Sequence, residues 1–187
     1  VITLSSLAAD SNLANVTNNL TLNGAIPASA AFTSTFGSST LIINVAFKTT
    51  AAKLTGKTSS GTGTITLTSL DAASDLEDIS NTMIITGAQS TFTGLLGSGS
   101  LELNNDLGIA TSAKVNGLTI TGTGRITINA GGSLVSDANL SGISNVMTFS
   151  AASGGDAAVI QNSFTGTLGS GVLTINGTLG TTAAKVT

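Results

Sequence analysis

A short pattern of apolar and variable positions recurs along the chain. It consists of an apolar residue, a variable residue, a second apolar residue and then Asn, Ser or Thr. Nine segments carry it: ITLS from Ile2, LTLN from Leu20, LIIN from Leu41, ITLT from Ile65, MIIT from Met83, LELN from Leu101, ITIN from Ile126, MTFS from Met147 and LTIN from Leu173. A period of two predicts strands whose apolar residues point inward and whose middle residue points outward.

The spacing of these segments predicts how the strands are arranged. Successive segments start 18 to 26 residues apart, and the variation falls in stretches rich in Gly, Ser and Ala. Three short strands with their turns need about 20 residues, so each segment marks one coil of a solenoid. We therefore expect an all-β fold, a parallel β-solenoid of about nine coils. A right-handed β-helix is preferred to a left-handed one because the coils are irregular in length.

A longer repeat groups the coils into three units of about sixty residues. The units cover residues 1–63, 64–124 and 125–187, and together they predict a single solenoid domain, 1–187. Several columns align between the units: Asn18, Asn81 and Asn145; Phe32, Phe92 and Phe164; Gly37, Gly97 and Gly169; Lys53, Lys114 and Lys185.

Composition separates the solenoid from its main rival, a string of three small β-sandwich modules. Hydrophobic residues make up 41% of the chain, but aromatic residues only 3%, all of them Phe. Sandwich domains usually run to about 100 residues around a buried Trp or Tyr. Because neither residue is present, the solenoid is favoured, with a core built mainly from aliphatic side chains.

Charge and residue types remove several classes of function. The net charge is −3 and the six Lys and Arg residues are not clustered, so nucleic acid is not an expected partner. The apolar run LIINVAF is interrupted at Asn44 and is far shorter than a membrane span of about 18 to 20 residues, so membrane insertion is not expected. Without His or Cys, the chain lacks the residues of Ser-His and Cys-His nucleophile systems and of transition-metal sites. We expect no enzyme, no catalytic residues and no bound cofactor.

The acidic stretch DAASDLED is the main candidate for a metal site. Asp71, Asp75 and Asp78 place carboxylates at short spacing, the kind of ligand that Ca²⁺ prefers. Glu77 adds a fourth carboxylate, and a polysaccharide-acting enzyme that uses such carboxylates is the third functional alternative. A solvated turn that keeps the protein soluble explains the same residues.

The outward middle positions form a second candidate site. Six of the nine are Thr: Thr3, Thr21, Thr66, Thr127, Thr148 and Thr174. If the Asn, Ser or Thr that follows also faces outward, the solenoid carries two parallel polar ranks, an arrangement found in ice-binding solenoids. If that residue turns inward at a corner, the rank is a structural polar ladder. The recurring lysines Lys53, Lys114 and Lys185 are interpreted as protection of a face against sideways aggregation.

Over its whole length the chain resembles the repeat regions of large secreted bacterial surface proteins, of the S-layer and repeat-adhesin type. The resemblance is carried by its Thr, Ala, Gly, Asn and Ser content and by phrases such as AAKLTGKTSSGTGTITLTSL. It implies an extracellular or cell-surface location, and Ca²⁺ as the one cofactor such proteins often hold.

These observations favour a structural role. We expect a stalk, spacer, or lattice or filament element that associates with copies of itself, end to end or side by side. A binding module that uses the Thr-rich face, for ice or for carbohydrate, is the alternative.

Overall fold

The computed structural model describes residues 1–24, 30–150, 159–160 and 165–176. The chain forms two compact units, each described separately below. The first comprises Val1–Gly87 with Gly94–Glu102, and the second comprises Ala88–Thr93 with Leu103–Thr187.

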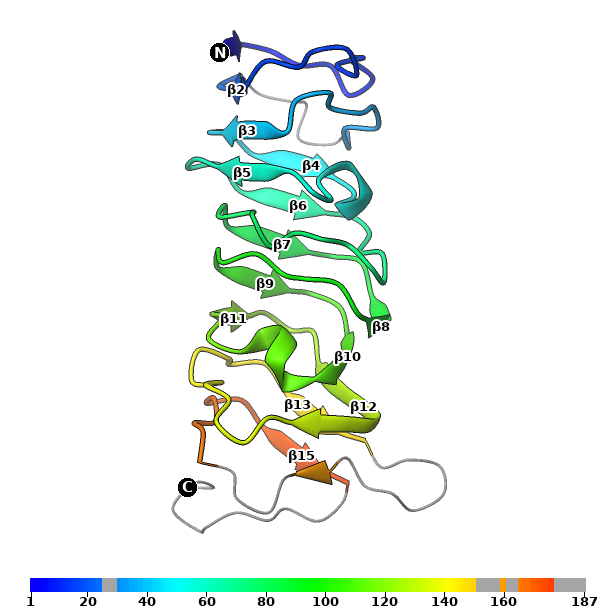
Figure 1. Ribbon diagram of the computed structural model, residues 1–187, viewed down its shortest axis with the longest axis vertical. Helices are drawn as coiled ribbons and strands as arrows, with labels where there is room; N and C mark the ends of the chain where they lie inside the picture. The colour runs from blue at the N-terminus through cyan, green and yellow to red at the C-terminus, as the bar shows by residue number, and fades with distance from the viewer. Residues whose placement is uncertain (25–29, 151–158, 161–164, 177–187) are drawn as a thin grey trace. The chain divides into compact units, whose positions relative to one another are not determined.

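The first unit contains a parallel sheet built from the first three predicted segments. Its strands are β1 (Ile2–Leu4), β2 (Leu20–Leu22), β3 (Thr40–Ile43) and β5 (Thr58–Ser60), paired in that order. In Figure 1, β1, β2 and β3 lie one below another as successive levels of the chain. Each level is one coil, because Ile2 pairs with Leu20 and Leu20 pairs with Leu41 in parallel register.

A second parallel sheet in the same unit carries the next three segments. It contains β4 (Phe47–Thr49), β6 (Ile65–Leu67), β7 (Met83–Ile85) and β9 (Leu101–Leu103), in the order β4-β6-β7-β9. A short 3₁₀ helix, η1 (Ala51–Lys53), follows β4. Isolated bridges of Leu13 with Phe36 and of Asp75 with Leu95 join coils outside the two sheets, and Ser59 of β5 bridges Ile79.

The second unit repeats this construction. Its main parallel sheet has the order β8-β10-β12-β13-β15, with β14 paired to β12. The strands are β8 (Gln89–Phe92), β10 (Leu107–Thr111), β12 (Ile126–Leu134), β13 (Met147–Phe149), β14 (Val159–Ile160) and β15 (Leu173–Ile175). The 3₁₀ helix η2 (Ser112–Val115) and the two-residue strand β11 (Ile120–Thr121) lie between β10 and β12.

The predicted fold class is confirmed. All nine segments form strands, the strand pairings that the structure describes are parallel, and stacked coils make a β-solenoid. The predicted inward positions are also confirmed for Leu22, Leu67, Leu103 and Ile128, which are at most 1% exposed. Ile175 pairs with Phe149 through its backbone, but its side chain lies outside the described part.

Phenylalanine contributes more to the core than the composition suggested. Phe32, Phe36 and Phe47 form a cluster in the first unit, with ring centroids 4.5 Å apart for Phe32 and Phe36 and 5.7 to 5.8 Å apart for the pairs with Phe47. Phe92 and Phe149 are buried as well. The rare rings are placed inside, where a large apolar side chain buries the most surface.

Glycine is required where coils approach most closely. A Cβ atom on Gly97 would lie 2.1 Å from the carbonyl oxygen of Ile79 in the preceding coil. The aligned Gly37 and Gly169 face the carbonyls of Ala14 and Ile143 at 2.1 and 1.9 Å in the same way. The glycine column of the repeat therefore reflects contact between main chains.

The three repeats do not place their strands in one column, which differs from the simplest interpretation of the sequence. β3 is followed in its sheet by β5, because Leu41 pairs with Ser59. The second repeat opens at Ile65, six residues after Ser59. Its first strand, β6, pairs with β4, where Ile65 lies against Phe47. Likewise β12, which opens the third repeat, pairs with β10 through Leu107. The three motif strands of each repeat thus lie in a different sheet from those of the other two repeats.

The inward and outward positions of one strand give a matched test. Leu67 is fully buried between Thr49 and Ile85, whereas its neighbour Thr66 is partly exposed. Leu67→Asp should lower the free energy of unfolding by more than about 3 kcal/mol, since it buries an unpaired charge and removes apolar contacts. Thr66→Asp should cost about 1 kcal/mol or less. Urea unfolding of both variants measures the difference, and equal shifts would contradict the assignment.

Candidate functional site

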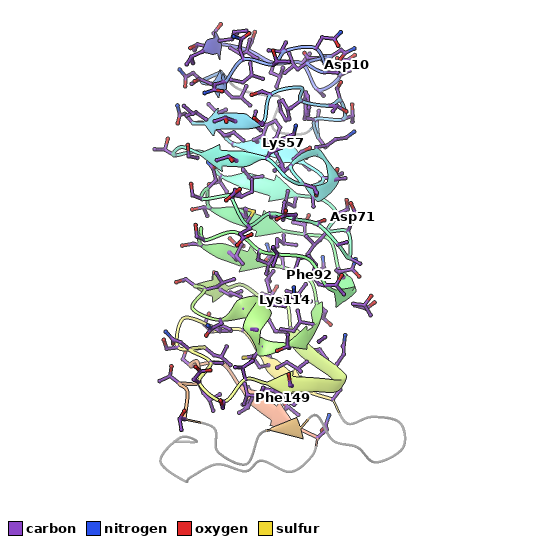
Figure 2. All side chains as sticks on the ribbon, viewed as in Figure 1. Asp10, Lys57, Asp71, Phe92, Lys114 and Phe149 are labelled. Carbon is purple, nitrogen blue, oxygen red and sulfur yellow. The ribbon has the colours of Figure 1, made fainter. Side chains whose placement is uncertain are left out.

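The acidic stretch lies on a turn at the surface of the first unit. Asp71, Asp75, Glu77 and Asp78 are all exposed, and Figure 2 shows Asp71 at the outer side of the coils. The carboxylate of Asp75 accepts a hydrogen bond from the backbone N–H of Glu77 at 3.3 Å. The backbone carbonyls of Asp75 and Asp78 accept from the N–H groups of Gly56 and Ser59, both at 3.0 Å. The backbone of the stretch therefore takes part in coil-to-coil hydrogen bonding.

The three proposed calcium ligands are not gathered into one group. In the described ranges of the chain, no set of three or more acidic, His or Cys residues is close enough to hold a metal ion. A shallow depression of about 280 Å³ beside Asp71 is lined by Ala52, Thr55, Ala73 and Ser74. Its hydroxyls are already engaged, because Thr55 Oγ1 donates to the Ala51 carbonyl and Ser74 Oγ accepts from the Asp71 N–H. Among the residues that line this depression, Asp71 is the one with a carboxylate.

The six outward threonines fall into three separate ladders. Thr3 and Thr21 pair with each other, and the ladder continues through Ile42 to Ser60. Thr66 lies between Lys48 and Ile84 in the second sheet. Thr127, Thr148 and Thr174 form an uninterrupted ladder in the second unit. The six threonines therefore do not lie in one sheet, because the motif strands of the three repeats belong to three different sheets.

The polar residues that follow the strands serve as structural ladders. The hydroxyls of Thr68 and Thr86 donate to the carbonyls of Thr49 and Leu67, one coil earlier, at 3.2 and 3.0 Å. In the first sheet, Asn44 Nδ2 donates to Asn23 Oδ1 at 2.8 Å. These positions form a hydrogen-bonded ladder, but Asn23, Asn44 and Thr86 are exposed, so these three residues do not turn inward as the second alternative required.

The recurring lysines belong to the 3₁₀ turns. Lys53 ends η1 and Lys114 lies in η2, whereas Lys185 lies outside the described residues. Lys114 Nζ donates to the carbonyl of Thr93 at 2.8 Å. This ammonium group therefore caps a backbone acceptor at a coil edge, in addition to charging the surface.

The turn between β5 and β6, which contains Gly61 and Gly63, forms a corner of the first unit. Asn81 organises this corner, a role that the sequence analysis did not identify. Its side chain is 1% exposed, and its Nδ2 donates to the carbonyls of Ile43, Gly61 and Gly63 at 3.1, 3.2 and 3.0 Å. Its Oδ1 accepts from Ser59 Oγ at 2.7 Å. One amide thus bonds main-chain carbonyls of earlier coils around the glycine-rich turn.

The second unit contains a similar corner, in which one of the three carbonyls and the donor to the amide oxygen differ. Asn145, also 1% exposed, donates through Nδ2 to the carbonyls of Thr121, Gly122 and Gly124 at 3.1, 3.2 and 2.9 Å. Ile120 bridges Ile143 as Ser59 bridges Ile79, so Ile120 stands where Ser59 stands in the first unit. Isoleucine has no hydroxyl, and Asn145 Oδ1 has no hydrogen-bond partner among the protein groups described.

A sequence signal for these corners existed in the repeated phrases GTG and ISN. Gly61, Gly63 and Asn81 recur as Gly122, Gly124 and Asn145. The aligned Asn18 is exposed, which shows that alignment alone does not reveal whether such an amide points inward. Its environment depends on the coils stacked on either side.

The first coil presents an exposed strand edge. β1 pairs with β2 on one side and, among the described residues, with no strand on the other. Ile2 is 38% exposed and Val1 is 82% exposed. Backbone groups and apolar side chains at such an edge can accept another strand.

Comparison of the chain with protein-family models, with curated proteins and with solved structures gives no match. Within the described ranges, no helix is long and apolar enough to span a membrane.

The Ser59–Asn81 bond can be tested by removing the hydroxyl. Ser59→Ala leaves a buried amide oxygen without its donor and should cost about 1–3 kcal/mol of stability. Ser60→Ala is the matched control, because Ser60 is the exposed neighbour on the same strand. Chemical denaturation should show a clear loss for the first variant and little change for the second. Similar behaviour of the two would argue against the role assigned to Asn81.

The acidic stretch leads to a prediction about metal removal. Because Asp71, Asp75 and Asp78 do not converge, EDTA should leave the melting temperature nearly unchanged, and added Ca²⁺ should not raise it. Differential scanning calorimetry with and without each reagent measures this. A large drop with EDTA that Ca²⁺ reverses would instead identify these carboxylates as ligands.

Proposed function

We propose that this chain is a structural β-solenoid segment of an extracellular or cell-surface protein, acting as a stalk, spacer or lattice element that associates with copies of itself. The observation that carries the proposal is the strand order of the described residues, in which β1 has β2 on one side and no strand on the other, so that either further repeats or a second copy can cover Ile2 and this edge. A second copy of the 187-residue chain offers strands of the same pattern, and strand addition at an open edge forms main-chain hydrogen bonds without a specialised pocket.

The use of the polar groups supports a structural role. The hydroxyls of Thr68 and Thr86, the ammonium group of Lys114 and the amide of Asn81 all bond backbone atoms of other coils. Groups engaged in this way strengthen the stack and are held in place by it. The absence of Cys, together with the resemblance to secreted surface repeats, supports the extracellular setting.

Sedimentation velocity tests the proposal with two matched variants. The unchanged chain should show a sedimentation coefficient that rises with concentration. Ile2→Lys should reduce this rise, because a lysine at the edge of a sheet opposes strand addition. Val146→Lys is the control, since Val146 is 37% exposed, close to the 38% of Ile2, but does not lie on β1.

Two results would oppose the proposal. One is a chain that stays monomeric over the whole concentration range. The other is equal weakening of association by both lysine variants, which would point to a general effect of charge and not to the edge of β1.

A further inference from the structure

A small cavity lies beside the buried amide of Asn145 in the second unit. Its volume is about 10 Å³, and it is lined by Asn145 and by apolar and glycine residues: Ile143, Met147, Leu168, Gly169, Gly171 and Leu173. Asn145 is 1% exposed, and its Oδ1 has no protein partner in the described part of the chain. A buried polar atom and a cavity therefore occur together.

The orientation of the Asn145 amide is fixed by its other atom. Nδ2 donates to three backbone carbonyls at 2.9 to 3.2 Å, so exchanging the nitrogen and oxygen would replace these bonds by contacts between acceptors. The oxygen therefore cannot gain a partner by flipping the amide. It needs a donor from elsewhere.

The first unit shows which group donates to the amide oxygen at an equivalent corner. At the equivalent corner the hydroxyl of Ser59 donates to Asn81 Oδ1 at 2.7 Å. Ile120 replaces this hydroxyl with an aliphatic side chain in the second unit. A buried carbonyl oxygen left without a donor is costly, and most such groups in proteins bond either a protein group or an internal water.

We propose that a single water molecule is bound in this cavity and donates a hydrogen bond to Asn145 Oδ1. The cavity volume of about 10 Å³ is at the lower limit of what one water needs. Gly169 and Gly171 have no side chains, so main-chain groups form part of the wall and can provide the further hydrogen bonds that an internal water makes. The water takes the place of the Ser59 hydroxyl in the corner of the second unit.

Crystal structures of the 187-residue chain and of two variants test this site directly. In the unchanged chain, ordered density should lie within hydrogen-bond distance of Asn145 Oδ1. Ile120→Ala should keep this water, whereas Ile120→Ser should place a hydroxyl on Oδ1, as Ser59 does for Asn81, and displace the water from it. A protein donor on Oδ1 in the unchanged chain, or no density within reach of it, would overturn the proposal.

Thermal unfolding gives a second readout that does not need crystals. Both variants at position 120 lose the same buried isoleucine, so their comparison isolates the hydroxyl. Because water already bonds Oδ1 in Ile120→Ala, the melting temperatures of Ile120→Ser and Ile120→Ala should differ by less than those of the unchanged chain and Ser59→Ala. A difference at position 120 as large as that at position 59 would mean that Oδ1 is unbonded without the hydroxyl, and would overturn the water site.

Discussion

The hydrogen bonds between the backbones of successive coils are the interaction on which each unit depends. In parallel pairing, each residue lies directly against its counterpart one coil away, as Ile65 does against Met83. This register stacks most of the inward apolar residues on apolar residues, although Leu41 pairs with Ser59 and Leu67 with Thr49. It also brings main chains so close at the turns that Gly97 cannot carry a side chain.

The corners are where this arrangement is most demanding. A turn interrupts the strand ladder, and its carbonyl groups must find donors while they remain buried. Asn81 meets this requirement with one side chain that bonds Ile43, Gly61 and Gly63. The polar content of the sequence, which at first suggests a binding surface, is thus partly explained by the needs of the backbone.

The sequence predicted the strands well because the alternation of apolar and variable residues within each segment is enough to indicate a strand and its inward side. All nine segments form strands, and the inward side chains were identified correctly in β2, β3, β6, β7, β9, β12 and β13, whereas Ile2, Leu4 and Leu173 in the first and last of these strands are partly or largely exposed. The sheet that each segment joins could not be predicted, because the five residues between Ser59 and Ile65 mark a corner by the phrase GTG but do not indicate which sheet the next strand joins. The buried position of Asn81 was missed for a related reason, since it is set by coils far away in the sequence.

The offset between repeats and coils has a consequence for how the chain can be divided. β4 belongs by sequence to the first repeat, yet its strand partner β6 belongs to the second. A cleavage or a domain boundary placed between residues 63 and 64 would therefore separate two hydrogen-bonded strands and expose Phe47 at a new edge. The sequence repeat is a unit of duplication but not a unit that can be excised, and shortened versions of this protein should end between coils, wherever the repeat happens to begin.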